Sequence, residues 1–107
     1  MKDIIVESVP LKNGIHLKLD GELLFLDSQE FMHKIPERVK DKGRYVVIDM
    51  AKLQFVDSAG LGAILYVSEA CRMQNQVVQI VNANPQVMNS LRTIQNVGTF
   101  ELHETVR

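Results

Sequence analysis

Residues 45–65 read YVVIDMAKLQFVDSAGLGAIL and contain the clearest architectural signal in this sequence of 107 residues. The continuous apolar run of residues 45–48 is typical of a strand that is covered on both faces, as strands are in parallel sheets. We expect this strand to end near Asp49 and a short loop to follow. A helix is then predicted over about residues 60–74, with Asp57-Ser58 at its start.

The segment before this stretch contains two strand signals and two turn signals. Residues 4–6 are β-branched, and residues 15–19 alternate apolar and polar side chains as a half-buried strand does. Asn13-Gly14 between them predicts a type I′ hairpin turn, because both residues tolerate positive φ angles. Asp20-Gly21 suits either a second turn or a bulge inside a continuing strand.

A first helix is predicted after these strands. In a variant capping box, Asp27 would cap the helix start and Glu30 would reach back to it. Gly43 is a suitable residue for the end of the helix. Pro36 lies inside the helical pattern, and proline removes a backbone hydrogen bond there. We therefore expect a kink or an early break at Pro36.

The last part of the sequence continues to alternate strands and helices. Residues 77–81 are a second apolar run, and Pro85 suits the first turn of another helix. Residues 100–103 are predicted to form a short last strand. The order is therefore ββαβαβαβ. It predicts an α/β fold with a mixed sheet packed against helices, in one domain over residues 1–107.

Composition and charge narrow the classes of function. Hydrophobic residues make up 46% of the chain and the formal net charge is −1, so there is no basic field to hold nucleic acid or anionic lipid. Cys71 is the single cysteine and cannot form an internal disulfide. No apolar run has the length of a signal peptide core or a transmembrane helix. We expect a soluble cytoplasmic protein that binds neither nucleic acid nor membranes.

Ser58 is the candidate functional residue because of its place at a helix start. Backbone N–H groups and the helix dipole favour an anion there, so a phosphate on Ser58 would be stabilised. Asp57 would repel that charge, but its carboxylate is placed to orient the hydroxyl for transfer. The simpler alternative is that Asp57 or Ser58 is only a helix N-cap, and the spacing alone favours this alternative.

Gly60 and Gly62 add a second observation, because each glycine in a helix costs about 1 kcal/mol relative to alanine. They predict either close approach of another backbone or tight packing on the chain's own sheet. The helix also carries two apolar stripes. These stripes consist of Leu61, Ile64 and Leu65 with Ser68, and of Ala63, Tyr66, Val67 and Ala70. An outer stripe would be free to bind a partner, and the alternative is one wide core face.

The strand of residues 46–49 followed by Asp57-Ser58-Ala59-Gly60-Leu61-Gly62 resembles the signature of STAS-domain anti-sigma factor antagonists, or anti-anti-sigma factors. The resemblance covers nearly the whole chain and includes Gly21-Glu22-Leu23, Asn84-Pro85 and residues 100–103. In that family the glycine of the Gly-Glu-Leu segment lies within the second strand. The resemblance therefore favours a bulge at Gly21.

The resemblance implies a phosphorylation switch. The unphosphorylated domain would bind an anti-sigma factor that is also a serine kinase of the histidine-kinase-like ATPase fold, and would thereby free a sigma factor. Phosphorylation of the serine matching Ser58 would end this binding, and a serine phosphatase would restore it. The phosphoacceptor environment would be Asp57, Ala59 and Gly60. The partner-binding residues would be Gly60, Leu61, Gly62, Ala63, Tyr66 and Val67.

One departure from the family pattern leaves an alternative function open. The family commonly has an acidic residue directly after the Gly-Glu-Leu segment, whereas this chain has Leu24. The alternative is a STAS scaffold that does not switch, in a signalling assembly or a lipid-transport complex. Self-association as a homodimer is also left open.

The sequence does not predict an enzyme. Val56 stands where a serine hydrolase would have the first glycine of Gly-x-Ser-x-Gly. The three histidines are distant from Ser58 in the sequence, and together with Cys71 they lack the spacing of a zinc site. The sequence also has no glycine-rich phosphate loop ending in lysine. We therefore expect no cofactor and no metal.

Overall fold

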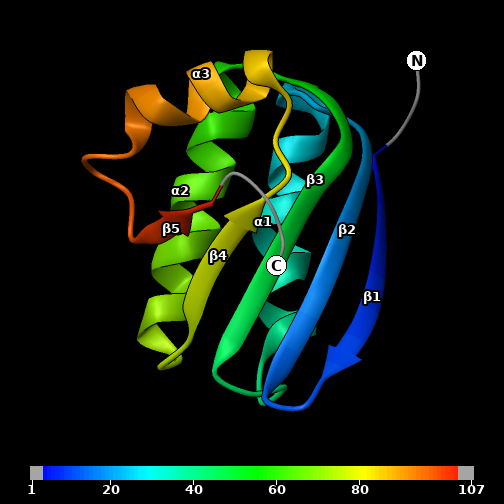
Figure 1. The fold of residues 1–107 in the computed structure, drawn as a ribbon, viewed down its shortest axis with the longest axis vertical. Helices are drawn as coiled ribbons and strands as arrows, with labels where there is room; N and C mark the ends of the chain where they lie inside the picture. Colours follow the sequence, from blue (N-terminus) through cyan, green and yellow to red (C-terminus); the bar gives the residue numbers. More distant parts are fainter. Residues whose placement is uncertain (1–3, 104–107) are drawn as a thin grey trace.

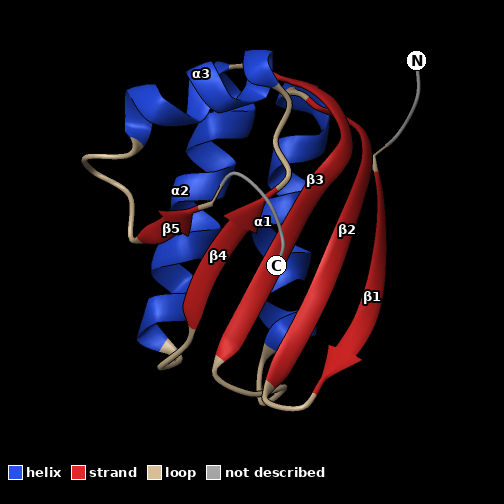
Figure 2. Ribbon diagram, in the orientation of Figure 1, coloured by secondary structure: helices blue, strands red, loops and turns tan. Residues whose placement is uncertain are grey.

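The computed structural model describes residues 4–103 and shows a mixed sheet with helices packed against it (Figure 1, Figure 2). Its elements are β1 (Ile5–Leu11), β2 (Gly14–Leu23), α1 (Phe25–Val39), β3 (Tyr45–Val56), α2 (Ser58–Met73), β4 (Val77–Val81), α3 (Pro85–Ile94) and β5 (Phe100–Leu102). The strands are ordered β1-β2-β3-β4-β5, with β1 antiparallel to β2 and every later pair parallel. This arrangement confirms the predicted α/β class and element order.

The long helices α1 and α2 lie side by side on one face of the sheet, and the hydrophobic core lies between them and the strands (Figure 2). In β2, Ile15, Leu17 and Leu19 face this core, whereas His16 and Lys18 face the other side. That alternation confirms the predicted half-buried strand. Within residues 4–103, no helix covers the opposite face of β1, β2 and β3, which we call the open face (Figure 1).

Pairing between β2 and β3 continues to the point where both helices begin. β2 runs through Gly21, whose φ is 119°, to Leu23, and the register shifts on either side of Gly21. The predicted bulge is thereby confirmed. The prediction that the next strand ends near Asp49 is wrong. β4 pairs with β3 only as far as Asp49, but β2 pairs with β3 as far as Val56. The irregular register between β2 and β3 breaks the alternation of apolar and polar residues by which a strand is recognised in a sequence.

The hairpin between β1 and β2 turns one residue earlier than predicted. Lys12 and Asn13 form the loop, and neither has a positive φ, so the predicted type I′ turn is wrong. Asn13 instead accepts hydrogen bonds from the backbone N–H groups of Arg44 and Tyr45. Gly14 begins β2, where a Cβ atom would lie only 2.0 Å from the carbonyl oxygen of Tyr45.

The first helix begins earlier than the capping box predicts. Phe25 is the first residue of α1, and Asp27 is the third. Asp27 Oδ2 accepts from the backbone N–H of Leu24 at 3.2 Å, so Asp27 takes the part that was predicted for Glu30. Half of the capping box is therefore present, shifted by three residues, because the N-cap Leu24 has no side-chain acceptor to complete it.

The same helix continues past Pro36 to Val39, so the predicted break is wrong. Ile35 and Val39 are buried in the core and hold the last turn in place. The carbonyl oxygens of Pro36 and Val39 accept hydrogen bonds from the side-chain amides of Gln74 and Gln76, which follow α2. Carbonyl groups at a helix end lack donors within the helix, and these two glutamines supply them.

Candidate functional site

The helices α1 and α2 begin at the same end of the molecule, where β2 and β3 end (upper end of Figure 1). Each helix follows directly on one of these strands. Ligand sites of open α/β sheets commonly lie at this carboxyl end of the strands. We call residues 24–26 and 57–62 the helix-start surface. It includes all residues predicted for the phosphoacceptor and its environment.

Asp57 joins the two helix starts. Its Oδ1 accepts from the Gly60 N–H at 2.8 Å and caps α2, and its Oδ2 accepts from the Phe25 N–H at 2.9 Å. The backbone N–H of Asp57 donates to the Leu23 carbonyl oxygen at 3.2 Å. A carboxylate is favoured here because the positive ends of two helix dipoles meet. Asp57 is therefore the N-cap, one of the two capping alternatives that the sequence left open.

Ser58 has no part in this capping. It is the first residue of α2 and is exposed. Within the described range 4–103 its hydroxyl has no hydrogen-bond partner, and the N–H groups of Ser58 and Ala59 have no acceptor. A phosphate on Ser58 would meet these two N–H groups and the positive end of the helix dipole. Orientation of the hydroxyl by Asp57 stays a prediction, because both carboxylate oxygens accept from backbone donors.

The two glycines of α2 have different surroundings. A Cβ atom on Gly60 would lie 2.3 Å from the Leu23 carbonyl oxygen and 2.6 Å from Val56 Cγ2. Tight packing on the chain's own sheet therefore explains Gly60. Gly62 is exposed, and a Cβ atom there would have nothing within 4 Å. The described fold does not require glycine at this position, and the close approach of another backbone to Gly62 stays a prediction.

The prediction of an outer apolar stripe on α2 is partly wrong. Ala63 and Val67 are 1% and 0% exposed, because α2 packs against α1 as well as the sheet and needs a wide core face. Tyr66, in contrast, is 56% exposed. The predicted partner-binding residues therefore divide into Leu61, Gly62 and Tyr66, which reach the surface, and Gly60, Ala63 and Val67, which are buried.

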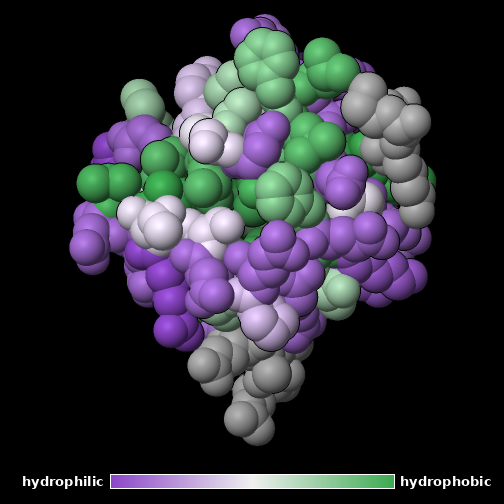
Figure 3. Space-filling view, turned by 90° about the horizontal axis from the view of Figure 1, so that it is seen from above, coloured by the Kyte–Doolittle hydropathy of each residue, from purple (hydrophilic) through white to green (hydrophobic). Residues whose placement is uncertain are grey.

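The first turn of α1 carries an exposed apolar pair that was not predicted from the sequence. Phe25 and Leu26 are each 69% exposed, and Asp57 fixes the backbone of Phe25 beside the start of α2. Figure 3 is a view onto this end of the molecule and shows hydrophobic side chains gathered among polar ones. The apolar residues are visible in the sequence, where residues 23–26 read LLFL, but such a run is typical of the end of a buried strand and does not indicate an exposed surface.

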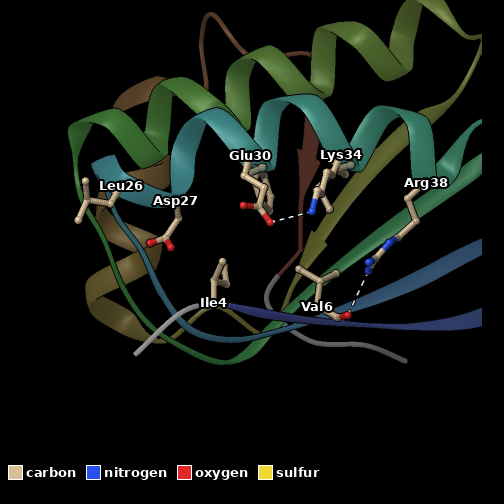
Figure 4. Close-up of a pocket in the computed structure, with 9 residues that line it drawn as sticks. Ile4, Val6, Leu26, Asp27, Glu30, Lys34 and Arg38 are labelled. Atoms are coloured by element: carbon tan, nitrogen blue, oxygen red, sulfur yellow. Dashed lines mark hydrogen bonds and ion pairs between the residues drawn. The ribbon is translucent and has the colours of Figure 1, made fainter. Parts of the chain in front are cut away.

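A groove of about 310 Å³ runs between β1 and α1 from the same helix turn (Figure 4). Leu26 and Asp27 line one end of it, and Lys34 and Arg38 line the other. Arg38 Nη1 donates to the carbonyl oxygen of Val6 at 3.1 Å and so covers a backbone group of the edge strand. Covers of this kind oppose pairing of an edge strand with another chain.

The open face carries a separate polar cluster. His16 Nε2 and Asp49 Oδ2 are 2.9 Å apart, and Asp49 Oδ1 accepts from the Ala51 N–H and the Asn82 amide. Burial would raise the pKa of Asp49, but the hydrogen bonds from Ala51, Asn82 and His16 together lower it below its ordinary value. The carboxylate is therefore held in its charged form by neighbours on the same face.

The remaining reactive side chains have structural surroundings. Cys71 is buried, and burial raises the pKa of its thiol to about 11, so it is a poor nucleophile near neutral pH. In the part of the chain that the structure describes, no three His, Cys, Asp or Glu side chains are placed to hold a metal ion. None of the helices between residues 4 and 103 is both long and apolar enough to cross a membrane.

Residues 7–107 match the family model described as the STAS domain, and the chain therefore belongs to the STAS domain family. This match confirms the resemblance that residues 46–49 and 57–62 suggest. The curated proteins include no match to this sequence.

Several solved structures share the fold. SpoIIAA, an anti-sigma factor antagonist in its unphosphorylated form, is 18% identical with a TM-score of 0.71, over 96% of this chain and 89% of that one. A candidate antagonist from Thermotoga maritima is 16% identical with a TM-score of 0.81, over 94% and 87%. A sulfate transporter family protein from Wolinella succinogenes is 14% identical with a TM-score of 0.72, over 94% and 83%. At these identities the likeness shows the fold alone.

Proposed function

We propose that this chain is an anti-sigma factor antagonist whose partner binding is switched off by phosphorylation of Ser58. The observation that carries the proposal is the exposed hydroxyl of Ser58, which has no hydrogen-bond partner among residues 4–103, since its neighbour Asp57 caps α2. Membership of the STAS family and the likeness in fold to SpoIIAA support the same function. The proposed activity is protein binding in the cytoplasm, not catalysis.

The partner would be an anti-sigma factor that is also a serine kinase of the histidine-kinase-like ATPase fold. In the unphosphorylated state it would cover Ser58 together with Leu61, Gly62 and Tyr66, which are the accessible residues of α2 nearby. A phosphate adds about −1.5 to −2 charges at neutral pH. Burying that charge in the interface would require its desolvation, so the phosphorylated chain would leave the partner. A serine phosphatase would restore binding.

The test is isothermal titration calorimetry of three full-length chains against the purified anti-sigma factor kinase of the source organism. The wild type and Ser58→Ala should bind with the same affinity, and only the wild type should be phosphorylated. Ser58→Asp should bind at least tenfold more weakly. Urea unfolding of each variant is the control, because substitution of an exposed residue should change stability by no more than about 0.5 kcal/mol. Full affinity of Ser58→Asp would exclude the switch.

A STAS scaffold that does not switch is the second candidate. The likeness to the sulfate transporter family protein, with a TM-score of 0.72, favours it, because the fold alone does not select between an antagonist and a domain of another assembly. On this hypothesis Ser58→Ala, Ser58→Asp and the wild type would all keep the same partner. In the titration against the kinase the three chains would then all give the same result, whereas the switch predicts weaker binding of Ser58→Asp alone, so the experiment separates the two candidates.

A further inference from the structure

The first turn of α1 exposes more apolar surface than its place in the fold requires. Phe25 and Leu26 are the first two residues of the helix and are each 69% exposed. Helix starts usually carry polar side chains, and adjoining exposed apolar side chains often mark a contact with another molecule. The pair adjoins Ser58 through Asp57, so it belongs to the helix-start surface and not to a separate site.

This pair is held in place rather than frayed at a helix end. The backbone N–H of Phe25 donates to Asp57 Oδ2 at 2.9 Å, and its carbonyl oxygen accepts from the buried Ser28 hydroxyl at 2.8 Å. Asp27 Oδ2 secures the preceding N–H of Leu24. A backbone that is already fixed loses little conformational freedom on binding, which favours the use of this turn as an anchor.

The charges beside the pair indicate what kind of surface would bind it. The pair itself is uncharged, and the adjoining carboxylates of Asp27 and Asp57 already accept backbone N–H groups. Three of the four carboxylate oxygens of Asp27 and Asp57 accept backbone N–H groups, so within residues 4–103 only Asp27 Oδ1 lacks a hydrogen bond and is open to a basic partner surface. Apolar side chains on the partner would instead remove both Phe25 and Leu26 from water.

We infer that Phe25 and Leu26 determine partner specificity, and that they enter an apolar pocket of the protein that Ser58 phosphorylation releases. The inference rests on the proposed function, because it concerns the same partner and the same surface. It adds the chemistry of the contact, which is apolar and centred on the first turn of α1.

The test is calorimetric titration of the full chain against the purified anti-sigma factor kinase of the source organism. The double variant Phe25→Ala/Leu26→Ala keeps every backbone hydrogen bond of the turn and should bind about thirtyfold more weakly, as expected for an interface anchor. Met73→Ala and Val97→Ala are matched controls, because these side chains are 74% and 73% exposed elsewhere on the molecule. Both controls should bind as the wild type does.

A third variant separates an apolar partner surface from a basic one. Leu24→Asp places a carboxylate at the N-cap of α1, where aspartate is favoured, so urea unfolding should show no loss of stability. We expect it to weaken binding at least fivefold. Tighter binding of Leu24→Asp, or wild-type affinity of the double variant while Ser58→Asp has lost binding, would overturn this inference and leave the switch intact. Full affinity of Ser58→Asp, or failure of the wild type to bind, would instead overturn the proposed function and this inference with it.

Discussion

The open face and the helix-start surface use their carboxylates in different ways. On the open face Asp49 pairs with other side chains, among them His16 at 2.9 Å. Among residues 4–103, Asp57 at the helix-start surface accepts only from backbone N–H groups, the Ser58 hydroxyl has no hydrogen-bond partner, and Phe25 is 69% exposed. In the part of the chain that the structure describes, the Asp49 carboxylate is fully hydrogen-bonded, whereas the helix-start surface has groups available for another molecule.

This difference makes two kinds of substitution distinguishable. A change at Asp49 on the open face should alter stability alone, because both of its carboxylate oxygens already have partners. A change at the helix-start surface should alter stability where the side chain or glycine serves the fold, and binding where it does not. The two glycines of α2 show both cases within three residues, since Gly60 is packed on β2 and Gly62 is in open space.

Gly60→Ala should have the largest effect on stability. The added methyl group would lie 2.3 Å from the Leu23 carbonyl oxygen and 2.6 Å from Val56 Cγ2, so the helix start must move away from the sheet. We expect the free energy of unfolding to fall by about 3 kcal/mol, measured by urea unfolding with circular dichroism. Gly62→Ala is the matched control. The control should lose no stability, and a Gly60→Ala variant that also lost none would show that the helix start is not packed as described.

Asp57→Ala should come next, with a loss of about 2 kcal/mol, because it removes the cap of α2 and the acceptor for the Phe25 N–H. Asp57→Asn keeps one side-chain oxygen that can accept a hydrogen bond, so its free energy of unfolding should fall by about half as much. Amide hydrogen exchange measured by NMR should show faster exchange at both Gly60 and Phe25 in Asp57→Ala. Faster exchange at Gly60 alone would mean that Asp57 does not join the two helices.

Gly62→Ala should stabilise the chain by about 1 kcal/mol, because alanine is the better helix former and the new methyl group meets nothing. If a partner backbone approaches here, the same variant should bind the anti-sigma factor kinase more weakly. Urea unfolding and calorimetric titration should therefore change in opposite directions. Unchanged affinity would mean that no partner contacts the helix at this residue.

Much of the fold could be predicted from the sequence, because its strands and helices have clear local signals. The apolar run 45–48 lies in a strand and Asn84-Pro85 starts a helix, as predicted. The expectation that this strand is covered on both faces is wrong, because Tyr45 is 38% exposed and Val47 is only partly buried on the open face. The errors arose where distant residues decide the local structure. α1 begins at Phe25 because its N–H is bound by Asp57, 32 residues away. It passes Pro36 because distant glutamines bind the carbonyl oxygens at its end.

The candidate site was located from the sequence, but its surface was only partly identified. Asp57 and Ser58 stand at the start of α2, as their residue types predict. The periodicity of α2 could not show that Ala63 and Val67 are buried, because that depends on the packing of α1 against the same helix. The exposure of Phe25 is also a tertiary property, since an apolar run next to a strand normally continues into the core.

The smallest predicted effect on stability is that of a substitution on the open face, the first of the two surfaces compared above. Asp49→Asn should lower the free energy of unfolding by about 0.5 kcal/mol at neutral pH, because charge-assisted hydrogen bonds from Ala51 and His16 are weakened. The pKa of Asp49 is lowered in the folded chain, so its charge adds stability above the ordinary value of 3.8. That contribution is lost as the pH falls through the lower folded pKa.

The difference in free energy of unfolding between the wild type and Asp49→Asn should therefore become smaller as the pH is lowered. Urea midpoints at neutral pH and below the ordinary Asp pKa would measure it, with Asp41→Asn in the exposed turn after α1 as a control for general charge effects. Binding to the anti-sigma factor kinase should be the same for Asp49→Asn and the wild type. Weaker binding would show that the open face also contacts the partner, and the two surfaces could then no longer be treated as separate.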